Sequence, residues 1–482
     1  MPTPRVVRFR RPEDEVAARE LREGIAAIQA ELGVSPEFDE EVLRVAEAAA
    51  AAPRLPALDR TDIPFLSIDP PGAMDLDQVL HIERRGSGYR VHYAIADLAA
   101  FITPGDAVDR EANRRGETLY GADSKIPLHP PVISEGAGSL LPDQVRPALL
   151  WTLTLDETGE GTDVTVERAR VRSRARYDYD QAQELIDSGQ AQESLALLAE
   201  VGPLRLAREA ARGGVSLPLP DQQIDMSGTS WKLEFRQLLP VESWNAQLSL
   251  LTGIAAASLM VQGQVGLLRT LPPADPRDVA RLRRTAQGLG LEWPSEVAYS
   301  DFVRTLDPAE PRHAAMVVAC TRLFRGSGYA GFHGEVPAQP GHAAIAADYA
   351  HVTAPLRRLV DRYASEICLA LCAGEEVPSW VLSKLEEVPD TMRESGRRAN
   401  QYQNAILNLM EAEVLGDRVG ESFDAVVVEV DEKDPRRGEV NLVDLAIEAK
   451  VSSERELPLG AEVSVRLTEA DPATRRVGFT LD

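Results

Sequence analysis

The spacing of apolar residues changes three times along this chain of 482 residues. Residues 12–32 and 35–52 carry apolar side chains three and four positions apart, which predicts two helices, the second capped by Ser35. Between about 64 and 175, short apolar or alternating runs indicate strands. The predicted strands lie at 63–68, 79–83, 89–95, 149–155 and 164–171.

Helical spacing dominates from about 178 to 415, with Pro203 expected to interrupt one helix. The predicted helices lie at 180–186, 191–211, 243–264, 276–288, 313–324, 356–372 and 382–415. Strands followed by helices are typical of the α+β class. The apolar stretch at 248–268 contains Ser, Gly and Gln residues, so we expect a core helix and no membrane span.

Short β-rich runs return in residues 418–482. Strands at 422–430, 439–442, 446–451, 462–468 and 476–481 fit a small five-stranded barrel of OB-fold type. Such barrels often bind single-stranded nucleic acid, although this one has only Phe423 and Phe479 as aromatic residues, so a purely structural barrel is the alternative.

The pattern therefore divides the chain into three parts. Residues 1–60 form a helical region, compatible with a helix-turn-helix or with a packing appendage. Residues 61–417 form the main α+β domain, and residues 418–482 form the barrel.

Composition limits the function without naming it. The net charge of −24 and a pI of about 4.8 argue against a generally basic nucleic-acid protein, but an acidic chain can still carry a basic channel. Three cysteines and an amino terminus without a signal-peptide pattern predict a reducing, cytoplasmic location.

Three carboxylates within nine residues are the strongest chemical signal. Asp69, Asp75 and Asp77 follow a predicted buried strand, and Pro70 to Gly72 form a tight turn between them. Clustered carboxylates repel one another unless a cation neutralises them, and hard oxygen ligands suit Mg²⁺ or Mn²⁺. An Asp-rich solvated turn is the alternative.

Two further segments carry groups suited to a phosphate chain. Arg357 and Arg358 are expected in the first turn of a helix capped by Thr353, where a phosphate could bind. Surface arginines paired with Asp361 or Glu366 are the alternative. Tyr120 precedes a proline-rich run and either stacks on a base or packs against the prolines.

Together these segments resemble the catalytic domain of the ribonuclease II family. That family's first motif is Asp, five residues, then Asp-x-Asp-Asp, and Asp69, Asp75 and Asp77 fall on its first three carboxylates. The second family motif is close to Tyr-x-His-Phe-Thr-Ser-Pro-Ile-Arg-Arg-Tyr-x-Asp. The residues that fall on it are Tyr349, His351, Thr353, Pro355, Arg357, Arg358 and Asp361. The resemblance covers about residues 60–415, and the barrel matches the family's carboxy-terminal RNA-binding domain.

The resemblance implies a metal-dependent, processive 3′→5′ exoribonuclease that hydrolyses single-stranded RNA to nucleoside 5′-monophosphates. It implies that Asp69, Asp75 and Asp77 hold Mg²⁺, or Mn²⁺, and that Arg357 acts with them on the scissile phosphate. Tyr120 would stack at the 3′ end, with Arg358 and Tyr349 also contacting RNA. The expected protein is a monomer that needs no nucleotide cofactor and no membrane.

Departures from the family motifs keep a second function open. Gln78 stands where the family has a fourth aspartate, Gln403 aligns with a family glutamate, and helices replace the usual amino-terminal cold-shock barrels. A catalytically weak RNA-binding protein on the same fold is therefore the alternative. A phosphoesterase acting on another substrate is a third possibility.

Overall fold

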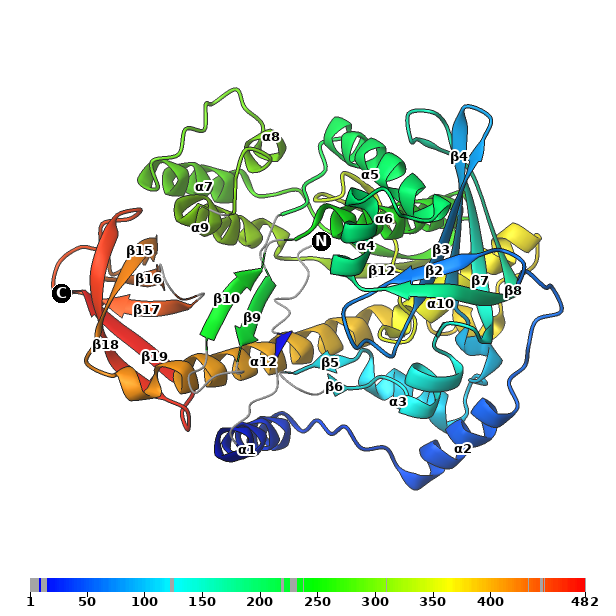
Figure 1. Cartoon of the computed structure of the whole chain (residues 1–482), viewed down its shortest axis with the longest axis horizontal. Coiled ribbons are helices and arrows are strands. Elements are labelled where there is room, and N and C mark those ends of the chain that lie inside the picture. The colour runs from blue at the N-terminus through cyan, green and yellow to red at the C-terminus, as the bar shows by residue number, and fades with distance from the viewer. Residues whose placement is uncertain are drawn as a thin grey trace.

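Two closed five-stranded barrels, joined by helices, organise the computed structural model of this protein (Figure 1). The structure describes residues 8–9, 15–121, 125–217, 221–225, 232–236, 238–308, 310–431, 433–442, 445 and 447–481. A long helix, α12 (Glu387–Leu415), runs from the larger domain to the carboxy-terminal barrel (Figure 1).

The first barrel has the strand order β2-β3-β4-β7-β8. The strands are β2 (Phe65–Ile68), β3 (Gln78–Arg85), β4 (Gly88–Ala96), β7 (Val145–Leu155) and β8 (Gly161–Tyr177). Neighbours pair antiparallel except β2 and β8, whose parallel pairing closes the barrel. In β8, Ala169, Val171 and Ser173 are buried and alternate with arginines, which is the period of a strand with one apolar face. The α+β class and the predicted strands are confirmed, whereas the sequence did not predict closure.

Helices cover this barrel and build the rest of the domain. They are α3 (Ala107–Arg115), α4 (Tyr179–Asp187), α5 (Glu193–Ala211), α6 (Pro240–Gln262), α7 (Pro276–Gly288), α8 (Tyr299–Val303), α9 (Pro311–Cys320), α10 (Leu359–Ala373) and α11 (Ser379–Leu382), with short turns η1 (Leu98–Ala100), η2 (Val132–Ala137), η3 (Thr321–Phe324) and η4 (Gly416–Arg418). The main hydrophobic core lies between the barrel, α5, α6 and α10.

The remaining strands are short. They are β1 (Arg8–Phe9), β5 (Leu119–Tyr120), β6 (Lys125–Ile126), β9 (Asp221–Asp225), β10 (Lys232–Arg236), β11 (Val265–Thr270), β12 (Gly328–His333), β13 (Gly341–His342) and β14 (Ala347–Asp348). They pair as β1-β9-β10, β5-β6, β11-β12 and β13-β14.

Two local predictions for the helices are wrong. Pro203 lies inside α5 without ending it. The helix expected from 356 begins only at Leu359, so Arg357 and Arg358 precede it, and the hydroxyl of Thr353 contacts Ser249 (2.8 Å) and caps no helix. Asp361 in the first turn of α10 accepts the Ala354 N–H (2.7 Å), which folds the preceding loop back onto the helix.

The amino-terminal helices exist but do not pack together as a helix-turn-helix. Helix α1 (Glu15–Leu32) shares a core with α12 and the carboxy-terminal barrel, whereas α2 (Glu40–Ala51) packs on α3 and η2. Asp39, and not Ser35, occupies the N-cap position of α2. Each helix therefore packs against a different part of the molecule.

The second barrel confirms the predicted strands and the OB-type fold. Its strands are β15 (Ser422–Val430), β16 (Arg437–Leu442), β17 (Glu448–Ser452), β18 (Glu462–Asp471) and β19 (Arg476–Leu481), in the closed order β15-β16-β17-β19-β18. Its apolar interior joins that of α12 and α1, so the predicted boundary at 418 crosses a continuous core.

One described helix, α6, is long and apolar enough to cross a membrane by length and composition alone, which is weak evidence. It packs against α5, α10 and β11 within the main core, as expected from the sequence.

Candidate active site

The three carboxylates lie in the loop between β2 and β3, at one end of the first barrel. The parallel pairing of β2 with β8 continues into this loop, because the Asp69 N–H donates to the Tyr177 carbonyl (3.1 Å). At the other end of the loop, the Ala96 N–H donates to the Asp77 carbonyl (2.9 Å). The closing β2–β8 pair therefore holds one end of the acidic loop, and the β3–β4 pair holds the other.

Asp77 connects the acidic loop to the arginine segment. Its carboxylate is buried and accepts the Leu356 N–H (2.7 Å), and its second oxygen lies 3.7 Å from Nε of Arg357. Burial raises the pKa of Asp77 well above its usual value, while Arg357 and the Leu356 N–H oppose that rise. The two motifs, 280 residues apart (77 to 357), thus meet at this carboxylate.

Asp69 and Asp75 have different surroundings. Burial raises the pKa of Asp69 to about 6, opposed by Arg176, and its Oδ2 atom is buried without a hydrogen-bond partner. Asp75 is paired with the Lys125 ammonium, with 2.8 Å between Oδ1 and Nζ. Asp75 and Asp77 therefore each lie within 4 Å of a cationic side chain, whereas Arg176 acts on Asp69 only through its charge.

The donor set suits a divalent metal ion. Among the described residues, no three His, Cys, Asp or Glu side chains stand in a ready-made metal cage. Asp75 nevertheless adds charge repulsion at both Asp69 and Asp77, so the three groups share one electrostatic site. A buried carboxylate oxygen without a partner is a ligand that a hard cation prefers. The metal assignment to Asp69, Asp75 and Asp77 stays a prediction.

A large cavity of about 1560 Å³ begins beside this site and extends to the second barrel. Tyr120, Arg357 and Arg358 line it together with Gln403 of α12. Basic residues from several elements share the lining: Arg269, Arg281, Arg284, Arg322, Arg325, Lys450, Arg475 and Arg476. Among the described lining residues, ten basic side chains outnumber seven acidic ones, so this acidic chain carries a cavity with a local excess of positive charge.

Tyr120 is held beside Arg357 by the main chain. The Thr118 N–H donates to the Arg357 carbonyl (2.9 Å), and the Leu359 N–H donates to the Gly116 carbonyl (2.9 Å). Strands β5 and β6 then form a small hairpin in which Tyr120 pairs with Lys125. Main-chain hydrogen bonds therefore join the segment of the predicted base-stacking residue to that of the predicted phosphate-binding residue.

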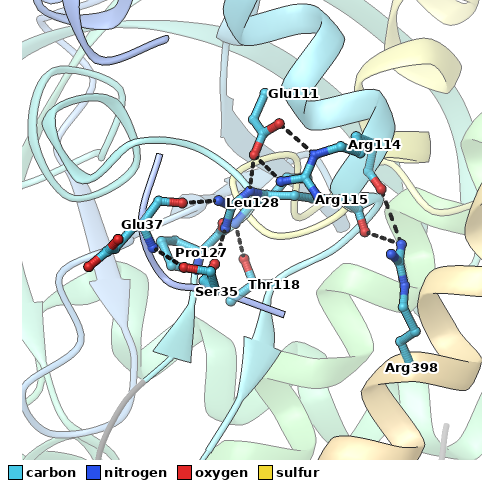
Figure 2. Close-up of polar contacts among 9 residues, drawn as sticks. All are labelled: Ser35, Glu37, Glu111, Arg114, Arg115, Thr118, Pro127, Leu128 and Arg398. Atoms are coloured by element: carbon cyan, nitrogen blue, oxygen red, sulfur yellow. Dashed lines mark hydrogen bonds and ion pairs between the residues drawn. The ribbon is translucent and has the colours of Figure 1, made fainter. Parts of the chain in front are cut away.

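Arg115 braces the base of this hairpin, as Figure 2 shows. Its guanidinium donates to the carbonyls of Ser35 (3.0 Å) and Pro127 (3.0 Å) and to the Glu111 carboxylate (2.7 Å). The Leu128 N–H donates to the Thr118 hydroxyl (3.0 Å). The linker that joins α1 to α2 thus supports the hairpin that carries Tyr120.

Arg358 and Tyr349 have strong partners within the protein. Arg358 donates two hydrogen bonds to Asp361, at 2.9 Å each, and it also lines the cavity. An arginine paired with Asp361 was one of the two alternatives that the sequence left open. Tyr349 is buried at 3% exposure against His342 and His351, and burial raises its pKa to about 12. RNA contacts by Arg358 and Tyr349 stay predictions; for Tyr349 they require its surroundings to open.

The two glutamines that depart from the family motifs lie in different places. The side-chain oxygen of Gln78 accepts the Tyr93 hydroxyl, so it is already engaged by the barrel. Gln403 is half-buried on the cavity face of α12.

Sequence reasoning missed two residues of the site. Lys125 contacts Asp75 and Glu135 (2.8 and 3.0 Å), and Glu117 faces the cavity with a buried, unpartnered Oε1 atom. Both flank Tyr120 within a few positions, so the charged residues around a predicted hairpin were the available signal. Their contacts depend on how that hairpin folds.

Family comparisons agree with this fold. Residues 58–372 match the RNB domain, and residues 421–482 match the RNase II-type exonuclease C-terminal S1 domain. The chain therefore belongs to the RNB-domain family, the ribonuclease II family that its motifs resemble.

Relatives share modest identity with this chain. The probable exosome complex exonuclease RRP44 of Caenorhabditis elegans is 28% identical over 77% of this chain and 41% of its own length. Ribonuclease R of Escherichia coli is 25% identical over 81% of this chain and 51% of its own length. This chain thus spans about half the length of these curated relatives.

Solved structures share the fold. Mycoplasma genitalium RNase R in complex with ribose methylated single-stranded RNA has a TM-score of 0.84 at 18% identity, covering 96% of this chain and 78% of that chain. Yeast Ssd1, described as a pseudonuclease, has a TM-score of 0.70 at 17% identity, covering 94% of this chain and 57% of that chain.

Proposed function

We propose that this protein is a metal-dependent 3′→5′ exoribonuclease that degrades single-stranded RNA processively to nucleoside 5′-monophosphates. One observation carries the proposal: the carboxylates of the β2–β3 loop, Arg357 and Tyr120 meet at one end of an arginine-lined cavity. The relatives of this chain are named as exonuclease and ribonuclease, and we expect RNA hydrolysis at this site as well.

The chemistry requires attack by water on a phosphodiester. A water oxygen bonds to phosphorus and the P–O3′ bond breaks, which leaves a 3′-hydroxyl on the shortened chain and a 5′-phosphate on the released nucleotide. Arg357 stabilises the charge that develops on the phosphate oxygens, and Asp77 keeps its guanidinium in place. The phosphate-binding side chain is thus positioned before RNA enters.

Family nucleases generally depend on a divalent metal ion, and the acidic loop supplies its expected ligands. Asp69, Asp75 and Asp77 would hold Mg²⁺ or Mn²⁺. The ion would supply Lewis-acid polarisation of the phosphate.

The position of Tyr120 is compatible with a terminal nucleotide held at the site, and the proposed 3′→5′ direction is that of the ribonuclease II family. An aromatic ring beside the arginine segment can stack on the terminal base, and stacking tolerates every base. The arginines farther along the cavity would hold the upstream phosphates without reading sequence. Contact with several nucleotides at once favours processive degradation of single strands.

A time course on 5′-labelled single-stranded RNA tests the proposal, with Mg²⁺, with Mn²⁺ and with chelator. The expected result is metal-dependent shortening from the 3′ end to a short core. Matched 3′-phosphorylated RNA and circular RNA serve as substrates for the polarity test. Cutting of circular RNA would contradict exonuclease action.

The alternative, a catalytically weak RNA-binding protein, rests on Gln78, whose oxygen accepts the Tyr93 hydroxyl and adds no charge to the site. Intact RNA that still shifts on a native gel, with and without metal, would favour this alternative.

A further inference from the structure

Lys125 contacts one carboxylate of the proposed site, Asp75, although sequence reasoning assigned it no role. Its ammonium is 2.8 Å from Asp75 and 3.0 Å from Glu135, and its side chain is 24% exposed. It is the cross-strand partner of Tyr120 in the β5–β6 hairpin. A cation therefore stands between the acidic loop and the residue proposed to bind the RNA end.

The charges around the acidic loop limit how many metal ions it can hold. Lys125 already faces Asp75, and Arg357 faces Asp77, so two of the three carboxylates have a resident cation. Gln78, next to Asp77, is neutral and bonded to Tyr93. Only Asp69 keeps a buried oxygen without a partner. One divalent ion would nearly balance this set, whereas two would leave a large excess of positive charge.

A purely structural ion pair is the competing explanation, because Lys125 also connects the hairpin to η2 through Glu135. Three features favour a role in the reaction. The ammonium contacts a carboxylate of the proposed site, it lies on the strand next to Tyr120, and its hairpin is hydrogen-bonded to the main chain of Arg357. Lysine and metal ions serve the same purpose at phosphoryl groups, namely stabilisation of developing negative charge.

We propose that Lys125 is a permanent cation of the active site. Its ammonium, beside Asp75, supplies the positive charge that a second divalent ion would otherwise provide. The protein then works with a single divalent ion, held by the carboxylates of the acidic loop. This inference rests on the proposed exoribonuclease function, since it assigns Lys125 a part in that reaction.

The test measures Mn²⁺ binding and hydrolysis separately, on the full chain. Calorimetric titration without RNA should give one tightly bound Mn²⁺ for the wild type. Lys125→Gln removes a charge that opposes metal binding, so the variant should bind its single Mn²⁺ about tenfold more tightly. Its kcat on RNA at saturating Mn²⁺ should nevertheless fall by about a hundredfold, with little change in KM.

Three variants separate this role from packing. Lys125→Arg keeps the charge and should keep wild-type Mn²⁺ affinity while recovering much of the rate. Glu135→Gln leaves the contact between Lys125 and Asp75 in place, so its Mn²⁺ affinity and its rate of hydrolysis should stay near those of the wild type. Lys384→Gln, a lysine in another ion pair outside the cavity lining, is the matched control. Thermal unfolding of each variant checks that it folds.

Several results would overturn the inference. If the Lys125→Gln variant hydrolyses RNA at the wild-type rate, Lys125 only forms a structural ion pair. Joint loss of Mn²⁺ binding and hydrolysis would show a structural role, and two tightly bound Mn²⁺ in the wild type would refute the single-ion site. If the wild type hydrolyses no RNA under any condition, both the proposed function and the catalytic role of Lys125 fail. The Mn²⁺ titration would still show whether the charge of Lys125 opposes metal binding.

Discussion

The two barrels of this protein contain the same number of strands but differ in where their parallel pair lies. In the first barrel, the parallel pair β2–β8 is the closing contact, and the acidic loop leaves directly from it. In the second barrel, the parallel pair β17–β19 joins the third and last strands. On the cavity side the second barrel presents Glu429, Glu439 and Glu448, which face arginines of the helical region.

The comparison shows that a closed barrel alone does not make a catalytic site. The first barrel becomes one because a later segment, 353–361, returns to its open end and donates to Asp77. The second barrel has no comparable segment among its described residues, and its charged side chains pair with a neighbouring part of the protein. The predictions below test this division of labour.

Asp77→Asn should have the largest effect. Asn can still accept the Leu356 N–H, so the fold should survive, but the charge opposite Arg357 is lost. We expect kcat to fall by about a thousandfold. Steady-state hydrolysis of labelled RNA measures it, with Asp163→Asn on the exposed end of β8 as the control. Unchanged turnover would remove Asp77 from the active site.

Truncation of a buried aromatic side chain should destabilise either barrel. Trp151 and Phe479 are both fully buried, and replacing either with Ala should cost about 3–5 kcal/mol of unfolding free energy. Denaturant unfolding followed by two probes measures the loss. Because the second barrel shares its core with α12 and α1, we expect Phe479→Ala to affect those helices as well. Separate melting of residues 418–482 alone would contradict that shared core.

Tyr120→Ala should change the end of the reaction more than its start. Loss of one stacked base weakens binding by about 1–3 kcal/mol, and this matters most when few nucleotides remain. The final product should therefore become longer, as read on a sequencing-resolution gel. Tyr120→Phe, which keeps the ring, should restore the wild-type product length. An unchanged product would mean that Tyr120 only packs.

Acid stability should be set by the larger domain, because none of the seven histidines lies in residues 418–482. Burial lowers the pKa of His129 to about 3, below its usual value near 6.5. The unfolded chain therefore binds the extra proton first, and stability falls as pH drops from about 6.5 towards 3. Asp69, whose pKa is raised to about 6, works in the opposite direction.

His129→Asn should reduce the loss of unfolding free energy between pH 7 and pH 5 by about 2 kcal/mol. Denaturant titrations at the two pH values measure this difference. Phe479→Ala, in the barrel without histidine, should keep the wild-type pH dependence. An unchanged dependence in the His129 variant would show that this histidine is not buried in its neutral form.

Glu429→Gln should have the smallest effect. Glu429 pairs with Arg281 (3.1 Å) and with Arg322, and all three side chains are partly exposed. Loss of these pairs should cost less than about 1 kcal/mol of stability. RNA binding should tighten about threefold at low salt, because both arginines line the cavity, and the gain should vanish at high salt. Weaker binding would show that Glu429 orders these arginines for RNA.

The sequence by itself determined the strands of both barrels and most of the long helices, and it supplied most of the residues of the candidate site. Local patterns suffice for the strands of both barrels, for α7 and for the three aspartates, because periodicity and turn residues act over short distances. Motif resemblance also brought Arg357 and Tyr120 into the same prediction.

Only the tertiary structure decided barrel closure, the separation of α1 from α2, and the contacts of Lys125 and Glu117. These depend on pairing between residues far apart in the chain, such as β2 with β8 and the β2–β3 loop with residues 353–361. Local spacing contains no information on such pairings, because they are selected by burial and hydrogen bonding of the whole core.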